Sequence, residues 1–150
     1  MSEASPPRRP ETMDMTFFGP SHVKVYQETK GETGYLWNGA TILLLTTKGR
    51  KSGQTRISPL IFVRDGEALA IIASKGGAPE HPAWYLNLRS DPDVQVQVKG
   101  EVFQAKARTA VGAERARIWD TAVKAWPQYA DYQKRTAREI PVVVLERAGA

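Results

Sequence analysis

The chain of 150 residues contains no cysteine and only two histidines. The lack of cysteine excludes disulfides, thiolate nucleophiles, cysteine-bound zinc and iron–sulfur clusters. His22 and His81 are separated by most of the predicted β-core, so they do not form the ligand cluster of a zinc hydrolase, and we expect no metal site. A chain of this length fits one domain and leaves no room for a separate catalytic domain.

Long apolar runs are also missing. No stretch approaches the roughly 18–20 apolar residues of a membrane-spanning helix, and the start of the chain does not resemble a signal peptide. Residues 1–12 are rich in proline, serine and arginine and predict a disordered lead, followed by a single domain over residues 13–150. Residues 13–28 predict one or two short amphipathic helices, which, with Trp37 close behind, either lie over a pocket or touch a membrane. We expect a cytoplasmic protein, with peripheral contact with the inner face of the membrane as an open alternative.

Several nucleotide-binding and catalytic motifs are absent. Lys51 and Ser52 follow a predicted strand, but Leu45 and Arg50 stand where a phosphate-binding loop needs glycine. Neither the dinucleotide fingerprint G-x-G-x-x-G nor the serine-hydrolase elbow G-x-S-x-G occurs. We interpret His81, at the start of a predicted helix, as a surface or capping residue. The chain therefore indicates a binding protein, or an enzyme whose chemistry comes from a bound cofactor.

Acidic residues are unevenly distributed. Lysine and arginine number 21 against 16 acidic residues, for a net charge of +5 at pH 7. No acidic residue occurs over residues 33–64, and this window holds five cations, Lys48, Arg50, Lys51, Arg56 and Arg64. A second acid-free stretch, 68–79, contains Lys75. The turn at 46–56 combines cations and hydroxyls with two glycines that can expose backbone N–H groups, so it predicts a phosphate or carboxylate site, with a solvated turn as the alternative.

Hydrophobic periodicity predicts strands separated by a few helices. Apolar runs and alternation indicate strands at 42–45, 57–63, 68–73, 93–98, 102–108 and 140–145. Helical spacing indicates helices at 79–88 and 113–126, with 129–138 as a continuation. These elements predict an α+β domain built on a closed or half-closed β-barrel of about six mostly antiparallel strands. Pro141 fits poorly in a central strand, so we expect that end of the last strand at an edge or rim.

Five sequence blocks resemble one known family in their order along the chain. They are LLTTKGRKSGQTR at 44–56, PL at 59–60, ASKGG at 73–77, PAWYLNL at 82–88 and PDVQV at 92–96. Over residues 41–145 the chain resembles the deazaflavin-dependent nitroreductase and quinone reductase family. The resemblance implies a split β-barrel of the flavin-reductase kind and coenzyme F420 as the cofactor. It further implies hydride transfer from the reduced deazaflavin to electron-poor substrates, namely quinones, enones, unsaturated lactones and, in some members, nitroaromatics.

The same resemblance implies four cofactor-binding segments. The phosphate and oligoglutamate tail would contact Arg50, Lys51 and Ser52, within the acid-free window. The other contacts would come from Arg56, Ile57, Ser58, Pro59, Leu60 and Ile61 beside the cofactor, from Ile72, Ala73, Ser74 and Lys75 on the opposing wall, and from Ala83, Trp84, Tyr85, Leu86 and Asn87 at a helix start.

On the substrate side, the resemblance implies an aromatic lining. Trp126, Tyr129 and Tyr132 recur at three-residue spacing, which on a helix presents one aromatic face. Trp126 and Ile61 stand where some nitro-reducing members have tyrosine, which favours enone or quinone reduction over nitroreduction. Tyr129 and Ser74 are candidate proton donors or polarising hydroxyls, with solvent as an alternative proton source. The predicted substrate-binding residues are therefore Trp126, Tyr129, Tyr132 and Ile61.

Two other functions remain open at this point. The chain could bind coenzyme F420 without turnover, as a carrier or sensor. Its basic face could instead bind nucleic acid, although the aromatic residues are not interleaved with the cations and no recognition helix is apparent. We therefore predict an F420-dependent reductase of a small electrophilic substrate that acts without nucleic acid, and we leave the oligomeric state open.

Overall fold

The computed structural model describes residues 19–148, so the predicted lead at 1–12 lies outside the described residues. The strands are β1 (Leu36–Trp37), β2 (Ala40–Lys48), β3 (Thr55–Asp65), β4 (Ala68–Ile72), β5 (Asp93–Val98), β6 (Glu101–Thr109) and β7 (Val142–Arg147). The helices are α1 (Pro20–Thr29), α2 (Ala83–Ser90), α3 (Gly112–Ala125) and α4 (Gln128–Lys134), with a short 3₁₀ turn, η1 (Lys75–Gly77). Among residues 19–148, no helix is both long enough and apolar enough to cross a membrane.

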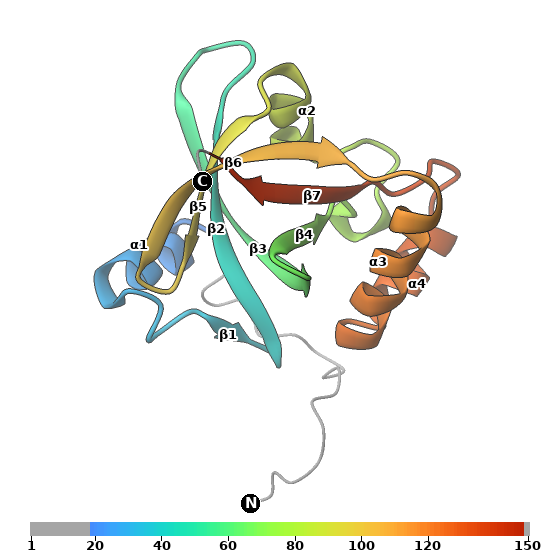
Figure 1. Ribbon diagram of the computed structural model, residues 1–150, viewed down its shortest axis with the longest axis horizontal. Coiled ribbons are helices and arrows are strands. Elements are labelled where there is room, and N and C mark those ends of the chain that lie inside the picture. The colour runs from blue at the N-terminus through green and yellow to red at the C-terminus, as the bar shows by residue number, and fades with distance from the viewer. Residues whose placement is uncertain (1–18, 149–150) are drawn as a thin grey trace, which may run out of the picture.

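Six antiparallel strands close into a barrel (Figure 1). The strands follow the order β2-β3-β4-β7-β6-β5, and the pairing of β5 with β2 closes the ring. The predicted α+β barrel is therefore confirmed, and within it β2, β3 and β4 form a meander and β5 and β6 form a hairpin. The two-residue strand β1, which the apolar pattern does not predict, extends the sheet beyond β2.

Alternate residues of the barrel strands face two separate apolar layers. The inner layer draws on all six barrel strands, with Leu43 and Leu45 of β2 as examples, and α2 adds Tyr85 and Leu88 to it. The outer layer takes the intervening residues of β2, β4 and β7, and α1, α3 and α4 pack against it. In Figure 1, α1 lies on one side of the barrel and the α3–α4 pair on the other. The barrel is thus packed on both faces of these three strands.

A tight hairpin joins β1 to β2 and fixes the position of Trp37. Asn38 and Gly39 form its two-residue turn, with φ angles of 50° and 85°. Positive φ at both central residues is characteristic of a type I′ turn, for which Asn-Gly is a favoured sequence. The turn pairs Trp37 with Ala40, a small residue. Trp37 is only 8% exposed although β1 lies outside the closed barrel.

Two prolines lie where the strands do not need a backbone N–H. Pro59 is opposite Leu44 of β2, in the part of β3 that precedes its pairing with β4. Pro141 immediately precedes β7, and β7 is paired on both sides, with β4 and with β6. Of the two expected positions for this end of the strand, an edge or a rim, the rim is the one found, because the strand itself is not an edge strand. Pro141 lies outside the ladder at the end of the strand, where its carbonyl accepts a hydrogen bond from the Ala73 N–H at 3.0 Å.

Candidate functional site

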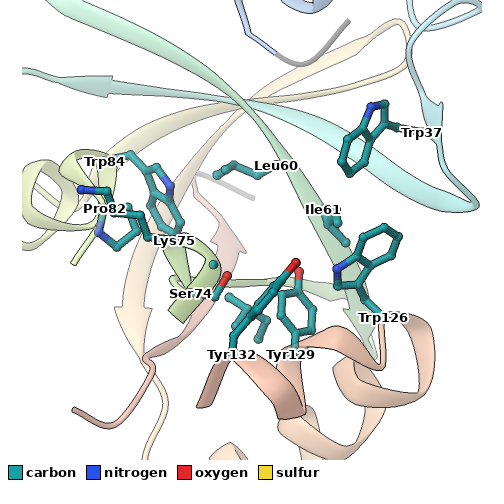
Figure 2. Close-up of a pocket in the computed structure, with 12 residues that line it drawn as sticks. Trp37, Leu60, Ile61, Ser74, Lys75, Pro82, Trp84, Trp126, Tyr129 and Tyr132 are labelled. Carbon is teal, nitrogen blue, oxygen red and sulfur yellow. The ribbon is translucent and has the colours of Figure 1, made fainter. Parts of the chain in front are cut away.

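A pocket of about 380 Å³ opens between β3, β4, η1, α2 and α4. Five of its twelve lining residues are aromatic (Figure 2), and we call it the aromatic pocket. Trp37 and Trp126 stand together at one end, whereas Trp84, Pro82 and Lys75 stand at the other. The lining residues are Trp37, Leu60, Ile61, Ile72, Ser74, Lys75, Gly76, Pro82, Trp84, Trp126, Tyr129 and Tyr132.

A second hollow of about 430 Å³ adjoins the aromatic pocket at Trp84, which lines both. It is bounded by the turn between β2 and β3, the start of β3 and the start of α2. Three of its lining residues are cations and none is acidic, and we call it the basic hollow. The lining residues are Gly49, Arg50, Lys51, Ser52, Arg56, Ile57, Ser58, Ala83, Trp84 and Asn87. A charged hollow beside a flat apolar pocket suits a ring compound with an anionic tail.

The turn between β2 and β3 closes on itself through hydrogen bonds. The Gly49 N–H donates to the Gln54 carbonyl at 2.7 Å, and the Gly53 N–H donates to the Gly49 carbonyl at 2.8 Å. The Gln54 N–H donates to Ser52 Oγ at 3.1 Å. A side chain at position 49 would be too close to this serine, because its Cβ would lie 2.9 Å from Ser52 Oγ. The turn therefore uses much of the expected N–H cradle internally, and side chains carry the positive charge into the hollow.

Asn87 links α2 to this basic turn. Its Oδ1 accepts hydrogen bonds from the Arg50 N–H at 3.2 Å and from Arg50 Nη1 at 3.0 Å. Its Nδ2 donates to Thr47 Oγ1 at 3.3 Å. Asn87 is 4% exposed, so this junction is buried beneath the hollow. Asn87 thus holds the Arg50 side chain without neutralising its charge.

The loop that follows β4 forms one wall of the aromatic pocket, and hydrogen bonds from Arg138 hold this loop in place. Arg138 Nη2 donates to the Ser74 carbonyl at 2.8 Å, and Nε donates to the Ala78 carbonyl at 2.9 Å. Arg138 Nη1 donates to the Ala73 carbonyl at 3.3 Å and lies 3.0 Å from His81 Nδ1. One guanidinium therefore binds acceptors at both ends of the loop that presents Ser74 to the aromatic pocket.

His81 lies behind the aromatic pocket and does not line it. Its ring packs against Tyr85, with centroids 4.9 Å apart. Burial, together with the charges of Arg138 and Arg89, lowers the pKa of His81 below its ordinary value. A neutral imidazole can accept a hydrogen bond from Arg138 at Nδ1. His81 therefore supports the loop and is more than the surface or capping residue expected from the sequence.

The same loop packs closely against α4. Gly77 has a φ of 86°, and a Cβ at this position would lie 2.6 Å from the Tyr132 carbonyl oxygen. Because both the backbone conformation and the available space require glycine, larger residues would push the loop and the helix apart. Gly77 therefore keeps these two walls of the aromatic pocket together.

Tyr129 and Tyr132 point their hydroxyls from α4 into the aromatic pocket (Figure 2). Their rings meet edge to face, with centroids 6.0 Å apart. Burial, with a smaller contribution from Tyr132, raises the pKa of Tyr129 well above its ordinary value. Within residues 19–148, the Tyr129 hydroxyl has no hydrogen-bond partner. The pocket therefore holds a phenol that stays protonated at physiological pH.

All four predicted substrate residues line the aromatic pocket, although they do not share one helix. Trp126 follows the end of α3, whereas Tyr129 and Tyr132 belong to α4, which begins after Pro127. The expectation of a single helical face is therefore wrong. The break at Pro127 lets two helices contribute to the same wall. Ile61 faces the pocket from β3.

Most predicted cofactor residues line one of the two cavities, but Pro59, Ala73, Tyr85 and Leu86 line neither. Ala73 and Tyr85 belong to the inner apolar layer of the barrel. The Tyr85 hydroxyl lies 2.8 Å from Thr109 Oγ1, so its polar end is already hydrogen-bonded. These side chains lie outside the lining of the cavities, and their neighbours along the chain form that lining.

Four lining residues were not among the predicted site residues: Gly49, Gly76, Pro82 and Trp37. Gly49 belongs to the turn predicted to bind an anion, and Trp37 was named only as a neighbour of a segment that lies over a pocket or touches a membrane. The signal for Trp37 was the Asn-Gly pair that follows it, because Asn-Gly between apolar residues indicates a tight hairpin. Such a hairpin folds Trp37 back against β2 and toward the pocket. The three others adjoin predicted site residues in the chain.

Comparison with known proteins identifies the family. The family model described as F420H(2)-dependent quinone reductase matches residues 20–147. The chain belongs to this family. A curated F420H(2)-dependent quinone reductase of Mycobacterium tuberculosis (strain H37Rv) is 42% identical over 130 residues, which cover 84% of this chain and 87% of the relative. The resemblance noted from the five sequence blocks is therefore confirmed.

Solved structures agree with this assignment to the F420H(2)-dependent quinone reductase family. One described as an F420-H2 dependent reductase, FDR-A, is 46% identical, with a TM-score of 0.66, and the match covers 70% of this chain and 93% of that one. A structure described as a domain-swapped dimer is 41% identical, with a TM-score of 0.68, and the match covers 83% and 92% of the two chains. The protein is therefore an F420-dependent reductase with coenzyme F420 as its cofactor. The residues present fit that group, since an acid-free basic hollow adjoins an aromatic pocket.

Proposed function

We propose that coenzyme F420 spans the two cavities, with its anionic tail in the basic hollow and its ring at the Trp84 end of the aromatic pocket. The substrate then lies toward the other end, between Trp37, Trp126 and the tyrosines of α4. The observation that carries this proposal is that one side chain, Trp84, lines both cavities. We propose flat, electron-poor substrates, with quinones, enones and unsaturated lactones ahead of nitroaromatics.

The basic hollow offers what a phosphate and oligoglutamate tail needs. Arg50 presents a planar guanidinium suited to paired contacts with carboxylate or phosphate, and Lys51 adds a point charge on a flexible stem. Arg56 extends the charge along β3, and the Ser52 hydroxyl can donate a hydrogen bond. Within residues 19–148, these cations have no acidic partner, so a bound anion displaces no carboxylate.

The aromatic pocket offers an apolar slot with a few hydroxyls. Leu60 and Ile72 contribute aliphatic surface, and the indoles and phenols contribute flat faces against which a conjugated ring can stack. The polar groups that reach this space include the hydroxyls of Ser74, Tyr129 and Tyr132. Such a slot favours a flat substrate that carries one or two carbonyl oxygens.

When bound in its reduced form, coenzyme F420 supplies a hydride. A quinone or enone that accepts a hydride needs one proton to complete the two-electron reduction. Tyr129 is our candidate donor, because its phenol is protonated and lines the pocket. Ser74, on the opposing loop, is our candidate for polarising the substrate oxygen by a hydrogen bond.

The test is a binding titration followed by a turnover assay. The protein is titrated with coenzyme F420 and, in parallel, with FMN. Oxidation of reduced coenzyme F420 is then followed optically with a naphthoquinone, a cyclic enone, an unsaturated lactone and a nitroaromatic. We expect preferential binding of F420 and faster oxidation with the quinone and the enone than with the nitroaromatic. Preference for FMN would contradict the proposal, and F420 binding without oxidation would favour a carrier.

A further inference from the structure

A separate groove adjoins the end of the aromatic pocket where the rings of Trp37 and Trp126 stack. This groove, of about 500 Å³, shares Ile61 with the aromatic pocket. Other parts of its lining lie close to the two tryptophans in the chain, residues 39–40 after Trp37 and residues 124–125 before Trp126. The two cavities therefore adjoin at Ile61, and we call Ile61 with the nearby indole pair the partition.

We infer that Trp37 is a specificity-determining residue, which closes the substrate end of the aromatic pocket and restricts the enzyme to compact electrophiles. Substrates whose rings or substituents extend past Ile61 would have to enter the groove, and the Trp37 indole blocks that path. This inference rests on the function proposed above. It concerns the size and shape of the substrate and leaves cofactor binding to the opposite end.

The partition is built from side chains that are fixed in place. The rings of Trp37 and Trp126 are 5.8 Å apart at 27°, which is a stacked arrangement. Trp126 is 2% exposed, and its backbone N–H donates to the Ala122 carbonyl at 2.8 Å at the end of α3. Trp37 is tied to Ala40 by the two-residue turn of the β1–β2 hairpin. A hairpin and a helix end therefore help to hold the two indoles in place.

Removing the indole should join the two cavities. Ala40, opposite Trp37, is too small to fill the space that an alanine at position 37 would leave. Ile61 is only partly buried and already faces both cavities. A substituent that extends from the aromatic pocket would then pass Ile61 into the groove toward Val63 and Lys124.

The experiment compares two quinones in the parent protein and in three variants. The compact probe is 2-methyl-1,4-naphthoquinone, and the extended probe carries an additional ten-carbon alkyl chain at position 3. The variants are Trp37→Ala, Trp37→Phe and Leu36→Ala. Leu36 is the matched control, because it belongs to the same two-residue strand but is 68% exposed and lines neither the aromatic pocket nor the groove. Binding of each quinone without cofactor is measured by calorimetry, and kcat/KM is measured with reduced coenzyme F420.

We expect Trp37→Ala to raise the extended-to-compact ratio, in both affinity and kcat/KM, by about tenfold, with a smaller rise for Trp37→Phe. Leu36→Ala should leave the ratio unchanged, and all variants should bind coenzyme F420 like the parent. An unchanged ratio in folded Trp37→Phe and Trp37→Ala would overturn the inference. If the parent reduces no quinone, the proposed function fails, whereas the calorimetric ratio still decides the role of Trp37.

Discussion

Arg50 owes its position in the basic hollow to the buried amide of Asn87. The substitution Asn87→Ala removes the acceptor of two Arg50 hydrogen bonds and the donor to Thr47. We expect the affinity for coenzyme F420 to fall about tenfold, because the guanidinium loses its fixed orientation. Fluorescence titration of the cofactor measures this.

The matched control for Asn87→Ala is Lys51→Gln, which removes a charge from an exposed side chain and leaves the Asn87 contacts intact. The affinity of Lys51→Gln for coenzyme F420 should fall below that of the parent mainly at low salt, since exposed charges are screened as ionic strength rises. The loss in Asn87→Ala should persist at high salt. Parent-like affinity in Asn87→Ala would show that Arg50 needs no such support.

Tyr129 offers a second test at the residue scale. The substitution Tyr129→Phe should lower kcat about 100-fold with little change in cofactor affinity, since a positioned proton donor is lost. Because burial raises the pKa of Tyr129, the parent should show no loss of activity between pH 7 and 9 from ionisation of this phenol. Stopped-flow oxidation of reduced cofactor provides the measurement. Tyr132→Phe is the control, and a fully active Tyr129→Phe would assign the proton to solvent.

Individual residues differ in how well the sequence predicts them. The cations of the basic hollow were predictable, because charges clustered in a turn remain close together in any fold of that turn. The placement of Tyr85 was not, because the inward face of a short helix is set by its packing on the barrel. Arg138 was also missed, since its acceptors are about 60 residues away in the chain.

At the scale of elements, Arg138 acts as a clamp between the segment after α4 and the loop after β4. The substitution Arg138→Met leaves the carbonyls of Ala73, Ser74 and Ala78 without this donor. We expect the free energy of unfolding to fall by about 1.5–3 kcal/mol, as measured by urea denaturation. Arg138→Lys should recover part of the loss, because an ammonium group still donates but does not reproduce the fork of the guanidinium. Equal stability of all three proteins would exclude a clamp.

His81 should make this clamp sensitive to acid. Its pKa is lower in the folded protein than in the unfolded chain, so the unfolded chain binds more protons as the pH falls. The stability that neutral His81 contributes is therefore fully present above about pH 6.5. It is lost as the pH falls below the pKa that His81 has in the unfolded chain. Urea unfolding at pH 7.5, 6.5 and 5.5 tests this. The variant His81→Gln should lose less stability over this pH range than the parent. An identical decline in the free energy of unfolding of both proteins would contradict this role of His81.

Strands were easier to predict than helix boundaries. Alternating or continuous apolar residues identified all six barrel strands, because each strand places residues on an inner or an outer layer. The helix expected over 79–88 is shorter, and η1 precedes it, since the Arg138 clamp and the close contact at Gly77 shape the preceding loop. Tertiary contacts of this kind leave no local pattern in the chain.

At the scale of the whole molecule, the two apolar layers share the same strands and should unfold together. Leu44 and Leu45 are adjacent in β2 but belong to the outer and the inner layer, respectively. The substitutions Leu44→Ala and Leu45→Ala should each lower the free energy of unfolding by about 2–5 kcal/mol. Circular dichroism and tryptophan fluorescence should follow one transition in both variants. Separate transitions for the two probes would show that the layers are independent.

Closure of the barrel also has a consequence for how long the protein takes to fold. The barrel closes where β2 pairs with β5, and we call this pairing the seam. It places Leu44 opposite Gln97, which is far along the chain. Tyr26 makes another contact between distant parts of the chain, because its Oη accepts a hydrogen bond from the Lys99 N–H at 2.7 Å. The entropy of closing such long loops must be overcome before these contacts form, which makes barrels slower to fold than helical bundles. The helix α2, which borders the basic hollow, comes directly before β5 in the chain, so we expect our proposed cofactor site to be completed together with this slow seam.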